Sequence, residues 1–378
     1  MNATALLKYE DVSKRYADRF DAVKGMNFSI ARGETIVLIG PSGCGKTTTL
    51  RMTNRLEEPT SGRILLNGVD TSEMDPTVLR RGMGYVIQGI GLFPHMSVWE
   101  NIATVPKLKG VHRGDLDGIV ERSMALMELD KKQYAGKYPH ELSGGQQQRV
   151  GVARALAGNP EIILMDEPFG ALDPLVRETL QGELLLIKER MSTTILFVTH
   201  DIHEAIKLGD RLVLMRDGEI VQIGDPLSLL ASPRNDFVAE FVGSRDILVR
   251  LKYLSAEKVS RVFEPPRVAV QGTFVQAKNA LTENPSGSDE ALCPLVCVVD
   301  DEGAPVGYVD ASAGYEDGVP LSACAAASKV LKREATAYEA LAAMVSANVT
   351  TIPIVEGNGR PVGVVTLSSL HDYVRGVL

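Results

Sequence analysis

A glycine-rich run near the start of the chain has the composition of a phosphate-binding loop. Residues 40–47 read Gly-Pro-Ser-Gly-Cys-Gly-Lys-Thr, which fits the pattern G-x-x-x-x-G-K-[ST]. Glycines let the backbone turn its N–H groups toward phosphate oxygens. A lysine at this spacing reaches the β- and γ-phosphates, and the next hydroxyl holds Mg²⁺. The predicted nucleotide-binding residues are Ser42, Gly43, Cys44, Gly45, Lys46, Thr47 and Thr48.

The segments on either side of this run have the pattern that a phosphate loop requires. Residues 35–39 are apolar and rich in β-branched side chains, and the run is too short for a helix, so it predicts a buried strand. Residues 48–52 can continue as a helix, whose N-terminus attracts anions. A glycine-rich turn with a chance lysine would not need this strand–loop–helix order. The context therefore favours a nucleoside triphosphate site.

A pair of acidic residues follows a second apolar segment. Residues 162–165 predict a strand, and Asp166 and Glu167 come directly after it. The carboxyl ends of parallel strands are where open α/β sheets bind ligands. Asp166 is suited to bind Mg²⁺ through water, and Glu167 can orient and deprotonate an attacking water. Two acids at a strand end are often only solvated, but next to a phosphate loop they predict hydrolysis of the nucleotide.

The run Leu-Ser-Gly-Gly-Gln at residues 142–146 comes shortly before this acidic pair. It precedes a predicted helix over 146–157, so Ser143 suits the N-cap position. The run also forms a second helix N-terminus that can face phosphate. One chain cannot apply two such anion sites to one nucleotide if they lie far apart on its surface.

From about Leu6 to Val242 the chain resembles the ATP-binding cassette (ABC) ATPases, with each motif of that family in order. The resemblance implies that Tyr16 stacks on adenine, that Gln88 senses Mg²⁺ and the attacking water, and that His200 contacts the γ-phosphate. It also implies a site completed by a neighbouring copy, in which two ATP molecules lie between the phosphate loop of one chain and the Ser-Gly-Gly run of the other.

The expected roles can be grouped by chemistry. The catalytic residues implied are Glu167, His200 and Gln88. The magnesium ligands implied are Thr47, Gln88 and Asp166. The residues expected to contact ATP across a homodimer are Ser143, Gly144, Gly145, Gln146 and Asp173. The resemblance thus predicts an ATPase that uses ATP and Mg²⁺ and works as a pair of identical cassettes.

Residues 89–101 are crowded with apolar and aromatic side chains and begin next to Gln88. They resemble the groove into which membrane subunits of importers insert a coupling helix, although they could also pack on the helices that follow. The chain is also similar to the cassette subunits of importers of quaternary ammonium osmoprotectants such as glycine betaine, carnitine and choline. The similar sequences lie at residues 86–111, 201–205 and 235–243. Two permease subunits are then expected to dock at 89–101, with an external substrate-binding protein acting indirectly.

Two alternatives remain at this point. An ABC importer for another small solute would have the same cassette, but an appendage built as a β-rich barrel would not contain the helix predicted over 337–347. A soluble ABC ATPase of DNA repair or translation usually shows a coiled-coil insertion or two fused cassettes, and the sequence shows neither. The formal charge of −8, from 40 basic and 48 acidic residues, also argues against a nucleic-acid partner.

The sequence predicts an α/β protein with two domains. Residues 1–243 are expected to form a P-loop NTPase (RecA-like) core with a helical subdomain at about 89–159 and an antiparallel β subdomain. Residues 244–378 are expected to form a smaller α/β domain with a regulatory role. It contains a repeat, because residues 295–309 align without gaps with 351–365 at an offset of 56.

The repeat resembles a pair of cystathionine-β-synthase (CBS) modules, at about 256–312 and 326–378. Residues 284–289, which match the helix of the second copy at the same offset, read Asn-Pro-Ser-Gly-Ser-Asp and predict a loop there. Neither copy has the Ser or Thr followed three residues on by Asp that the family uses to hold ribose. Nucleotide binding, dimerisation and ionic-strength sensing therefore all stay open for this domain.

The remaining composition fits a chain in a reducing compartment. Four cysteines are too scattered for a disulfide framework, and Cys293 and Cys297 are better explained as core thiols than as metal ligands. The chain shows neither a signal peptide nor a stretch of eighteen apolar residues. We therefore expect it at the cytoplasmic face of the cell (inner) membrane, held peripherally by the permease subunits.

Overall fold

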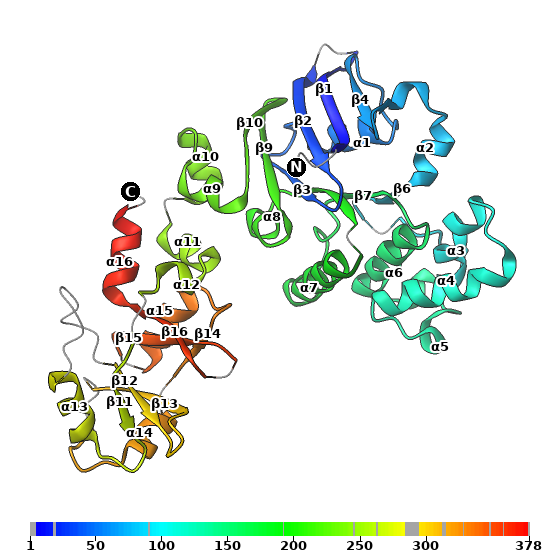
Figure 1. The fold of residues 1–378 in the computed structure, drawn as a ribbon. Helices are drawn as coiled ribbons and strands as arrows, with labels where there is room; N and C mark the ends of the chain where they lie inside the picture. Colours follow the sequence, from blue (N-terminus) through cyan, green and yellow to red (C-terminus); the bar gives the residue numbers. More distant parts are fainter. Residues whose placement is uncertain are drawn as a thin grey trace. The chain divides into compact units, whose positions relative to one another are not determined.

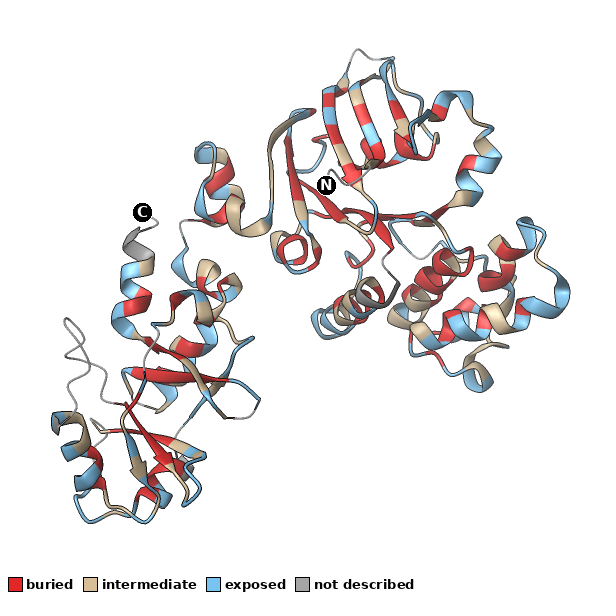
Figure 2. Ribbon diagram, in the orientation of Figure 1, coloured by how far each residue is buried: buried red, intermediate tan, exposed pale blue. Residues whose placement is uncertain are grey.

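Six short strands of the first 242 residues form one largely parallel sheet (Figure 1). Their order is β10-β9-β3-β8-β7-β6, and only the β9–β10 pair is antiparallel. Their bounds are Glu219–Gly224, Arg211–Arg216, Thr35–Ile39, Thr194–Val198, Ile162–Asp166 and Met83–Val86, in that order. Strands β3, β7 and β8 are buried at every position, as Figure 2 shows, and this is why they occur as continuous apolar runs in the sequence.

The computed structural model describes residues 5–17, 20–89, 91–191, 193–244, 246–261, 264–283, 295–311, 315–327, 329–347, 349–357 and 359–376. The chain divides into two compact units, Met1–Val242 and Gly243–Leu378. This division lies one residue from the predicted boundary. Each unit has its own buried apolar clusters.

An antiparallel sheet of order β2-β1-β4-β5 packs on the core of the first unit. Its strands are Asp21–Ala31, Ala5–Arg15, Ser61–Leu66 and Val69–Asp70. Helix α1 (Lys46–Thr53) joins it to the core, since the Tyr9 hydroxyl lies 2.5 Å from the Thr53 hydroxyl. The Tyr9 ring stacks on Phe28 with 4.2 Å between ring centroids. The predicted antiparallel β subdomain is therefore confirmed.

The helical subdomain lies between β6 and β7 and consists of α3 (Val98–Leu108), α4 (Arg113–Leu126), α5 (Lys131–Tyr134) and α6 (Gly144–Ala157). Capping boxes begin both α3 and α6. The other helices of this unit are η1 (Thr71–Glu73), α2 (Pro76–Gly82), η2 (Pro139–Glu141), α7 (Pro174–Met191), α8 (Ile202–Leu208), α9 (Pro226–Ala231) and α10 (Asp236–Phe241).

The second unit contains two modules with the same order of elements. The first consists of β11 (Arg267–Ala269), α13 (Phe274–Glu283), β12 (Leu295–Val299), β13 (Pro305–Asp310) and α14 (Leu321–Ala327). The second consists of β14 (Leu331–Lys332), α15 (Ala337–Ala347), β15 (Thr351–Val355), β16 (Pro361–Thr366) and α16 (Leu367–Gly376). Leu295 pairs with Asp310 and Thr351 with Thr366, so the repeat at an offset of 56 is confirmed.

The predicted loss of a helix in the first module is wrong. Helix α13 occupies that place, with Phe274 fully buried in the core of the module. Thr273 donates its N–H to the side chain of Gln276 at 2.9 Å, as Thr336 does to Glu339 at 2.7 Å, so the helices match at an offset of 63. The first module thus has seven more residues before its next strand, and a gapless alignment could not place them. Residues 284–289 themselves lie outside the described residues.

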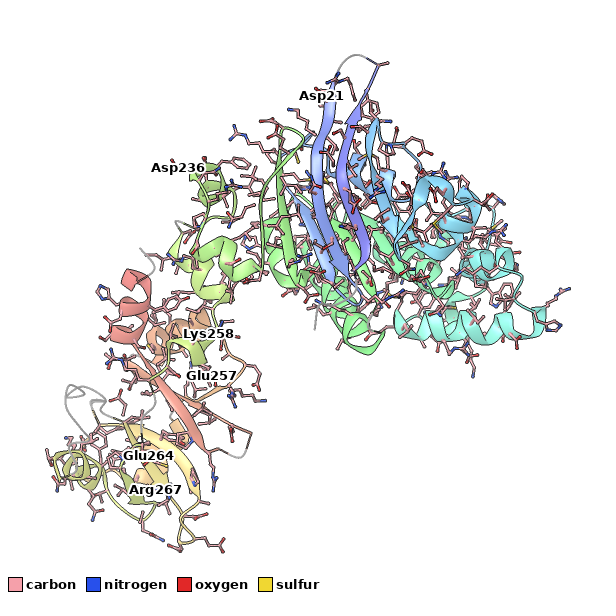
Figure 3. The ribbon with its side chains drawn as sticks, turned by 45° about the horizontal axis from the view of Figure 1, so that its top comes forward. Asp21, Asp236, Glu257, Lys258, Glu264 and Arg267 are labelled. Atoms are coloured by element: carbon pink, nitrogen blue, oxygen red, sulfur yellow. The ribbon has the colours of Figure 1, made fainter. Side chains whose placement is uncertain are left out.

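Two short helices that precede the first module pack on the second. Helices α11 (Ile247–Tyr253) and α12 (Ala256–Val259) contribute to the buried cluster that contains Met344. Glu257, at the start of α12 in Figure 3, accepts a hydrogen bond from Arg333 at 2.6 Å. Residues 256–259, predicted as the start of the first repeat, therefore belong to the core of the second module.

No helix in the part of the chain that the structure describes is both long and apolar enough to cross a bilayer.

The burial of α13 can be tested with Phe274→Ala. This change leaves a cavity in the first module, so the free energy of unfolding of the second unit should fall by about 3–5 kcal/mol. Calorimetry of the full chain measures it, and the transition of the first unit should not move because its core is separate. Val275→Ala, at a position that is 36% exposed on the same helix, is the control and should cost less than about 0.5 kcal/mol. Equal effects of both changes would contradict the placement of α13.

Candidate functional site

The predicted phosphate loop connects β3 to α1 and depends on two close backbone approaches. Gly40 and Gly45 have φ angles of 146° and 103°. A Cβ atom on Gly40 would lie 2.1 Å from the Met215 carbonyl oxygen, and one on Gly45 would lie 2.3 Å from that of Ala22. No other residue fits either position. The loop is thus held between the ends of β9 and β2 with its shape fixed.

The lysine of this loop folds back into it. Lys46 is only 5% exposed, and its ammonium donates to the carbonyl oxygens of Gly40 at 2.7 Å and Pro41 at 2.9 Å. The same ammonium is therefore already oriented toward the space that the loop encloses. Phosphate oxygens could take the place of these carbonyls as acceptors. A bound phosphate would then accept charge-assisted hydrogen bonds from the buried ammonium of Lys46.

Cys44 packs beneath the loop as a small apolar group. Its thiol is buried, and burial raises its pKa, which keeps the thiol protonated. Cys297 and Cys324 are buried too, and burial likewise raises their pKa values. Cys293 lies outside the described residues. Among the residues that are described, no cluster of three His, Cys, Asp or Glu side chains has the arrangement of a metal site.

Two oxygen atoms beside the loop suit a hard divalent cation. The Thr47 hydroxyl donates to Asp166 Oδ1 at 2.9 Å, although 119 residues separate the two in sequence. Asp166 is 2% exposed, and burial raises its pKa, against the effect of the Thr47 hydrogen bond and of the nearby Arg51. A cation held by both oxygens would compensate the buried carboxylate. Mg²⁺ is commonly bound by one or two protein oxygens together with phosphates, so the residues present fit this ion.

Glu167 is the meeting point of the predicted catalytic side chains. Its Oε2 accepts a hydrogen bond from Gln88 Nε2 at 3.2 Å and lies 3.2 Å from His200 Nδ1. The three residues follow β6, β7 and β8, which are neighbours in the sheet. Glu167 has a φ of 43°, unusual for a residue with a side chain, and its N–H donates to the Val198 carbonyl at 3.0 Å. The carboxylate is thus presented at the sheet edge beside Asp166.

The Ser-Gly-Gly run lies at an exposed corner formed by the starts of α6 and α7. Ser143 Oγ accepts from the Gln146 N–H at 3.3 Å, and the Gln146 side chain accepts from the Ser143 N–H at 3.0 Å. A Cβ atom on Gly145 would lie 2.6 Å from a methyl group of Val176, so glycine permits the two helices to meet. Asp173 caps α7 by accepting from the Val176 N–H at 3.0 Å.

Ser143, Gly144 and Asp173 are exposed at this corner. Among the described residues, no hydrogen bond or ion pair joins the corner to residues 40–48. The structure therefore brings the Ser-Gly-Gly run and Asp173 together, but it shows no bond from them to the phosphate loop of the same chain.

Tyr16 lies at the turn of the β1–β2 hairpin. Its N–H donates to the Phe20 carbonyl at 3.0 Å, and Lys14 Nζ lies 5.1 Å from its ring centroid. Strand β2 starts at Asp21, which is labelled in Figure 3, and continues into Ala22, whose carbonyl limits Gly45. The hairpin that carries Tyr16 thus leads directly to the phosphate loop.

A buried asparagine organises the apolar segment after Gln88. Asn101 of α3 is fully buried, and its amide donates to the carbonyls of Phe93 at 3.2 Å, Met96 at 3.0 Å and Ser97 at 3.0 Å. Its Oδ1 accepts from the Phe93 N–H at 2.9 Å. One side chain therefore fixes the path of five residues that have no regular secondary structure.

Helix α6 supports the same segment from the other side. Arg154 donates to the Gly91 carbonyl at 2.9 Å, and its guanidinium carbon lies 5.6 Å from the Phe93 ring centroid. Burial lowers the pKa of Arg154. Phe93 of this braced segment is 39% exposed, and Ile87, just before Gln88, is 37% exposed, so both present apolar groups to solvent. Ile90 lies outside the described residues.

The sequence reasoning did not single out Asn101 and Arg154 for these roles. The sequence does contain an indication for Asn101. It is a polar residue three positions after Val98 on the buried face of α3, next to Ile102, and a buried polar side chain needs hydrogen-bond partners. For Arg154 the sequence contains none, since the carbonyl it reaches is 63 residues away in sequence.

Comparison with protein families places two known domain types on the chain. The family described as "ABC transporter" matches residues 23–170, and the family described as "CBS domain" matches residues 328–376. The first match contains the phosphate loop, the Ser-Gly-Gly run and the acidic pair, and the second contains α15, β15 and β16.

Curated relatives match almost the entire chain. The osmoprotectant import ATP-binding protein OsmV of Salmonella typhimurium is 40% identical over 374 residues, which cover 98% of this chain and 96% of the relative. The glycine betaine/carnitine/choline transport ATP-binding protein OpuCA of Bacillus subtilis is 42% identical over 377 residues, with the same coverage of 98% and 96%.

Solved structures match the first unit. A dimeric ATP-binding cassette in a post-hydrolysis state, bound to ADP and Pi, is 33% identical with a TM-score of 0.53 and covers 58% of this chain and 98% of its own. The cbiO1 protein of Clostridium perfringens, part of an ABC transporter complex, is 28% identical with a TM-score of 0.57 and covers 61% and 92%.

The role of Asn101 can be tested with Asn101→Ala. The change leaves the Phe93 N–H and the Met96 carbonyl without their partner, while the carbonyls of Phe93 and Ser97 keep backbone donors, so hydrogen exchange at the Phe93 amide should accelerate about tenfold or more. The free energy of unfolding should fall by about 1–3 kcal/mol. Thr104→Ala is the control, because the Thr104 hydroxyl bonds to the Glu100 carbonyl within the same helix. Unchanged exchange at Phe93 would show that other contacts hold the segment.

Proposed function

The chain belongs to the ATP-binding proteins of ABC transporters, and from this premise we propose that it powers the import of a quaternary ammonium osmoprotectant. As a member of this family it is an ABC-type ATPase, and its second unit is of the CBS type. The cargo, the assembly and the roles of single residues are the content of the proposal.

The observation that carries the catalytic part is the convergence on Glu167. Gln88 and His200 both lie 3.2 Å from one oxygen of its carboxylate, next to the Thr47–Asp166 hydrogen bond. A water in place of these contacts would have a base to accept its proton and an amide to orient it. The arrangement supports attack on a γ-phosphate held by residues 40–48.

Each residue then has a role in the hydrolysis step. Glu167 takes a proton from water while the water oxygen bonds to the γ-phosphorus, and the bond from that phosphorus to the β–γ bridging oxygen breaks, so that ADP leaves. Lys46 holds the β- and γ-phosphate oxygens, His200 contacts the γ-phosphate, and Tyr16 stacks on adenine. Thr47, Asp166 and Gln88 would hold Mg²⁺, which neutralises phosphate charge when bound.

The exposed corner at Ser143 supports a homodimer. Its helix N-terminus faces outward and makes no bond to the phosphate loop of its own chain, so a second copy can use it. A similar cassette was solved as a dimer bound to ADP and Pi. In the proposed assembly Ser143, Gly144, Gly145, Gln146 and Asp173 contact the ATP of the partner. ATP closes the two cassettes and hydrolysis reopens them.

The braced segment after Gln88 supports docking of the membrane subunits. Phe93 is partly exposed on the loop that Asn101 and Arg154 hold in place, and Ile87 is partly exposed directly before that loop. Because the loop begins at Gln88, a change at the nucleotide can move a surface that a permease contacts. The ATPase would then lie at the cytoplasmic face of the cell membrane, and an external substrate-binding protein would deliver the cargo.

The cargo is assigned from relatives that match the full length. Two of them, with both the cassette and the second unit covered, are named for osmoprotectant import and for glycine betaine, carnitine and choline transport. We assign the second unit a regulatory role in the same transport.

The catalytic role of Glu167 predicts the behaviour of Glu167→Gln. The variant should bind MgATP with unchanged affinity but hydrolyse it on the order of a hundredfold more slowly, because the amide cannot accept the proton of water. It should also accumulate as a dimer with MgATP, which light scattering and ATPase assays can measure together.

The matched control adds Ser143→Arg to the same variant. An arginine at the exposed N-cap should block the dimer. It should leave ATP binding intact, because within the described part of the chain Ser143 makes no bond to the phosphate loop at residues 40–48 of its own chain. Normal turnover by Glu167→Gln would remove Glu167 as the base. Loss of ATP binding in the double variant would count against a site completed by a second copy.

The cargo assignment predicts the result of deleting the gene in its own host. Uptake of radiolabelled glycine betaine or choline at high external salt should fall, and the wild-type gene but not the Glu167→Gln gene should restore it. Uptake of a labelled sugar is the control and should not change. The reverse result, with sugar uptake lost and betaine uptake intact, would favour an importer for another solute.

A further inference from the structure

One arginine of α7 contacts two segments that the proposed mechanism uses separately. Arg177 Nη2 donates to the Leu172 carbonyl at 3.2 Å, in the residue before Asp173. Its Nη1 lies 3.6 Å from Asp201 Oδ2, and its Nε lies 3.9 Å from Glu204 Oε1. Asp201 directly follows His200. A single guanidinium therefore joins residues 171–173, which contain the Asp173 expected to contact the ATP of a second copy, to the segment that presents His200.

Glu204 holds the chain on both sides of His200. It is 4% exposed, and its Oε2 accepts from the Thr199 hydroxyl at 2.6 Å. The Thr199 oxygen in turn accepts from the Asp201 N–H at 3.0 Å. Because Thr199 and Asp201 flank His200, a shift of the Glu204 carboxylate moves the backbone that carries the imidazole.

The ion pair between Arg177 and this carboxylate is incomplete. Arg177 Nε is buried and has no hydrogen-bond partner, and the distances of 3.6 and 3.9 Å are longer than hydrogen bonds. Gln181 donates to Glu204 Oε1 at 3.3 Å, so the carboxylate keeps another partner. Buried donors are nearly always satisfied in stable arrangements. A movement of the Leu172 segment toward α8 by about 1 Å would complete both contacts.

We propose that Arg177 is a positioning residue that couples the Asp173 segment to His200. When a second copy docks on residues 171–173, Arg177 moves with the Leu172 carbonyl and closes on Asp201 and Glu204. This fixes His200 in the contact with Glu167 that it already makes in the single chain. The inference rests on the proposed homodimer and adds the path by which docking reaches the cis catalytic group. The pairing is intramolecular, so each cassette would sense its partner through its own α7.

A second cation on α7 provides a matched control. Lys188 donates to the Leu208 carbonyl at 3.3 Å and to Asp210 at 2.7 Å, so it also joins α7 to the region of α8. It lies three helical turns further along α7 and contacts the end of α8 instead of its start. A residue that only fastens α7 to α8 would behave like Lys188.

The test uses the full chain with Arg177→Met, Arg177→Lys, Glu204→Gln and the double variant Arg177→Met/Glu204→Gln, with Lys188→Met as the control. Arg177→Met should lower kcat about tenfold while KM for ATP changes less than about twofold, because the phosphate loop is untouched. Arg177→Lys should restore part of the loss. The double variant should be no slower than the worse single variant, since both changes break one pair.

Dimerisation gives a second readout that does not depend on turnover. In the Glu167→Gln background, Arg177→Met should weaken MgATP-driven dimerisation about tenfold, and Lys188→Met should not. If Arg177→Met does not fold, Arg177→Lys and Glu204→Gln carry the same comparison.

Three results would overturn the coupling: a kcat for Arg177→Met within about twofold of the parent, an equal loss in Lys188→Met, or losses that multiply in the double variant. Failure of the parent to hydrolyse MgATP, or of Glu167→Gln to dimerise, would instead contradict the proposed function, and with it the coupling.

Discussion

The constraint on which the site depends is the parallel register of β3, β8, β7 and β6. Leu38 pairs with Val198 and Val198 with Asp166, so these strands end level at one edge of the sheet. The loops that leave this edge carry the phosphate-binding run, His200, Glu167 and Gln88. Because parallel strands are buried on both faces, their apolar runs leave little freedom in register. The meeting of Gln88 and His200 at Glu167 follows from this register.

Buried polar side chains then determine the irregular parts around that edge. Asn101 fixes the segment after Gln88, Asp166 holds Thr47, and Glu204 holds Thr199 beside His200. Each of these groups satisfies backbone or hydroxyl partners that no regular secondary structure would satisfy. The nucleotide site and the segment after Gln88 are parts of one framework, because Gln88 donates a hydrogen bond to Glu167. Arg177, whose contacts are incomplete, is where that framework can still change.

In the second unit the strand register is also fixed, but the length of a connection between elements is free to vary. Its two modules keep the pairing of their last two strands at a constant offset, because a change in strand register would move apolar side chains to the wrong face. The connection before those strands has gained seven residues in the first module without loss of α13. Long connections cost little conformational free energy compared with the burial of a helix.

The sequence alone determined the strands, the phosphate loop, the acidic pair and the family, because each depends on residue type and spacing within a short segment. It also determined the repeat at an offset of 56, since paired strands conserve their spacing. It wrongly predicted a loop in place of the helix of the first module, because an insertion is invisible to a gapless alignment. The tertiary structure decided the contacts of Asn101, Arg154 and Arg177, and the packing of α11 and α12 on the second module. These contacts join residues that are distant in the chain or lie in different modules, and only folding brings such partners together.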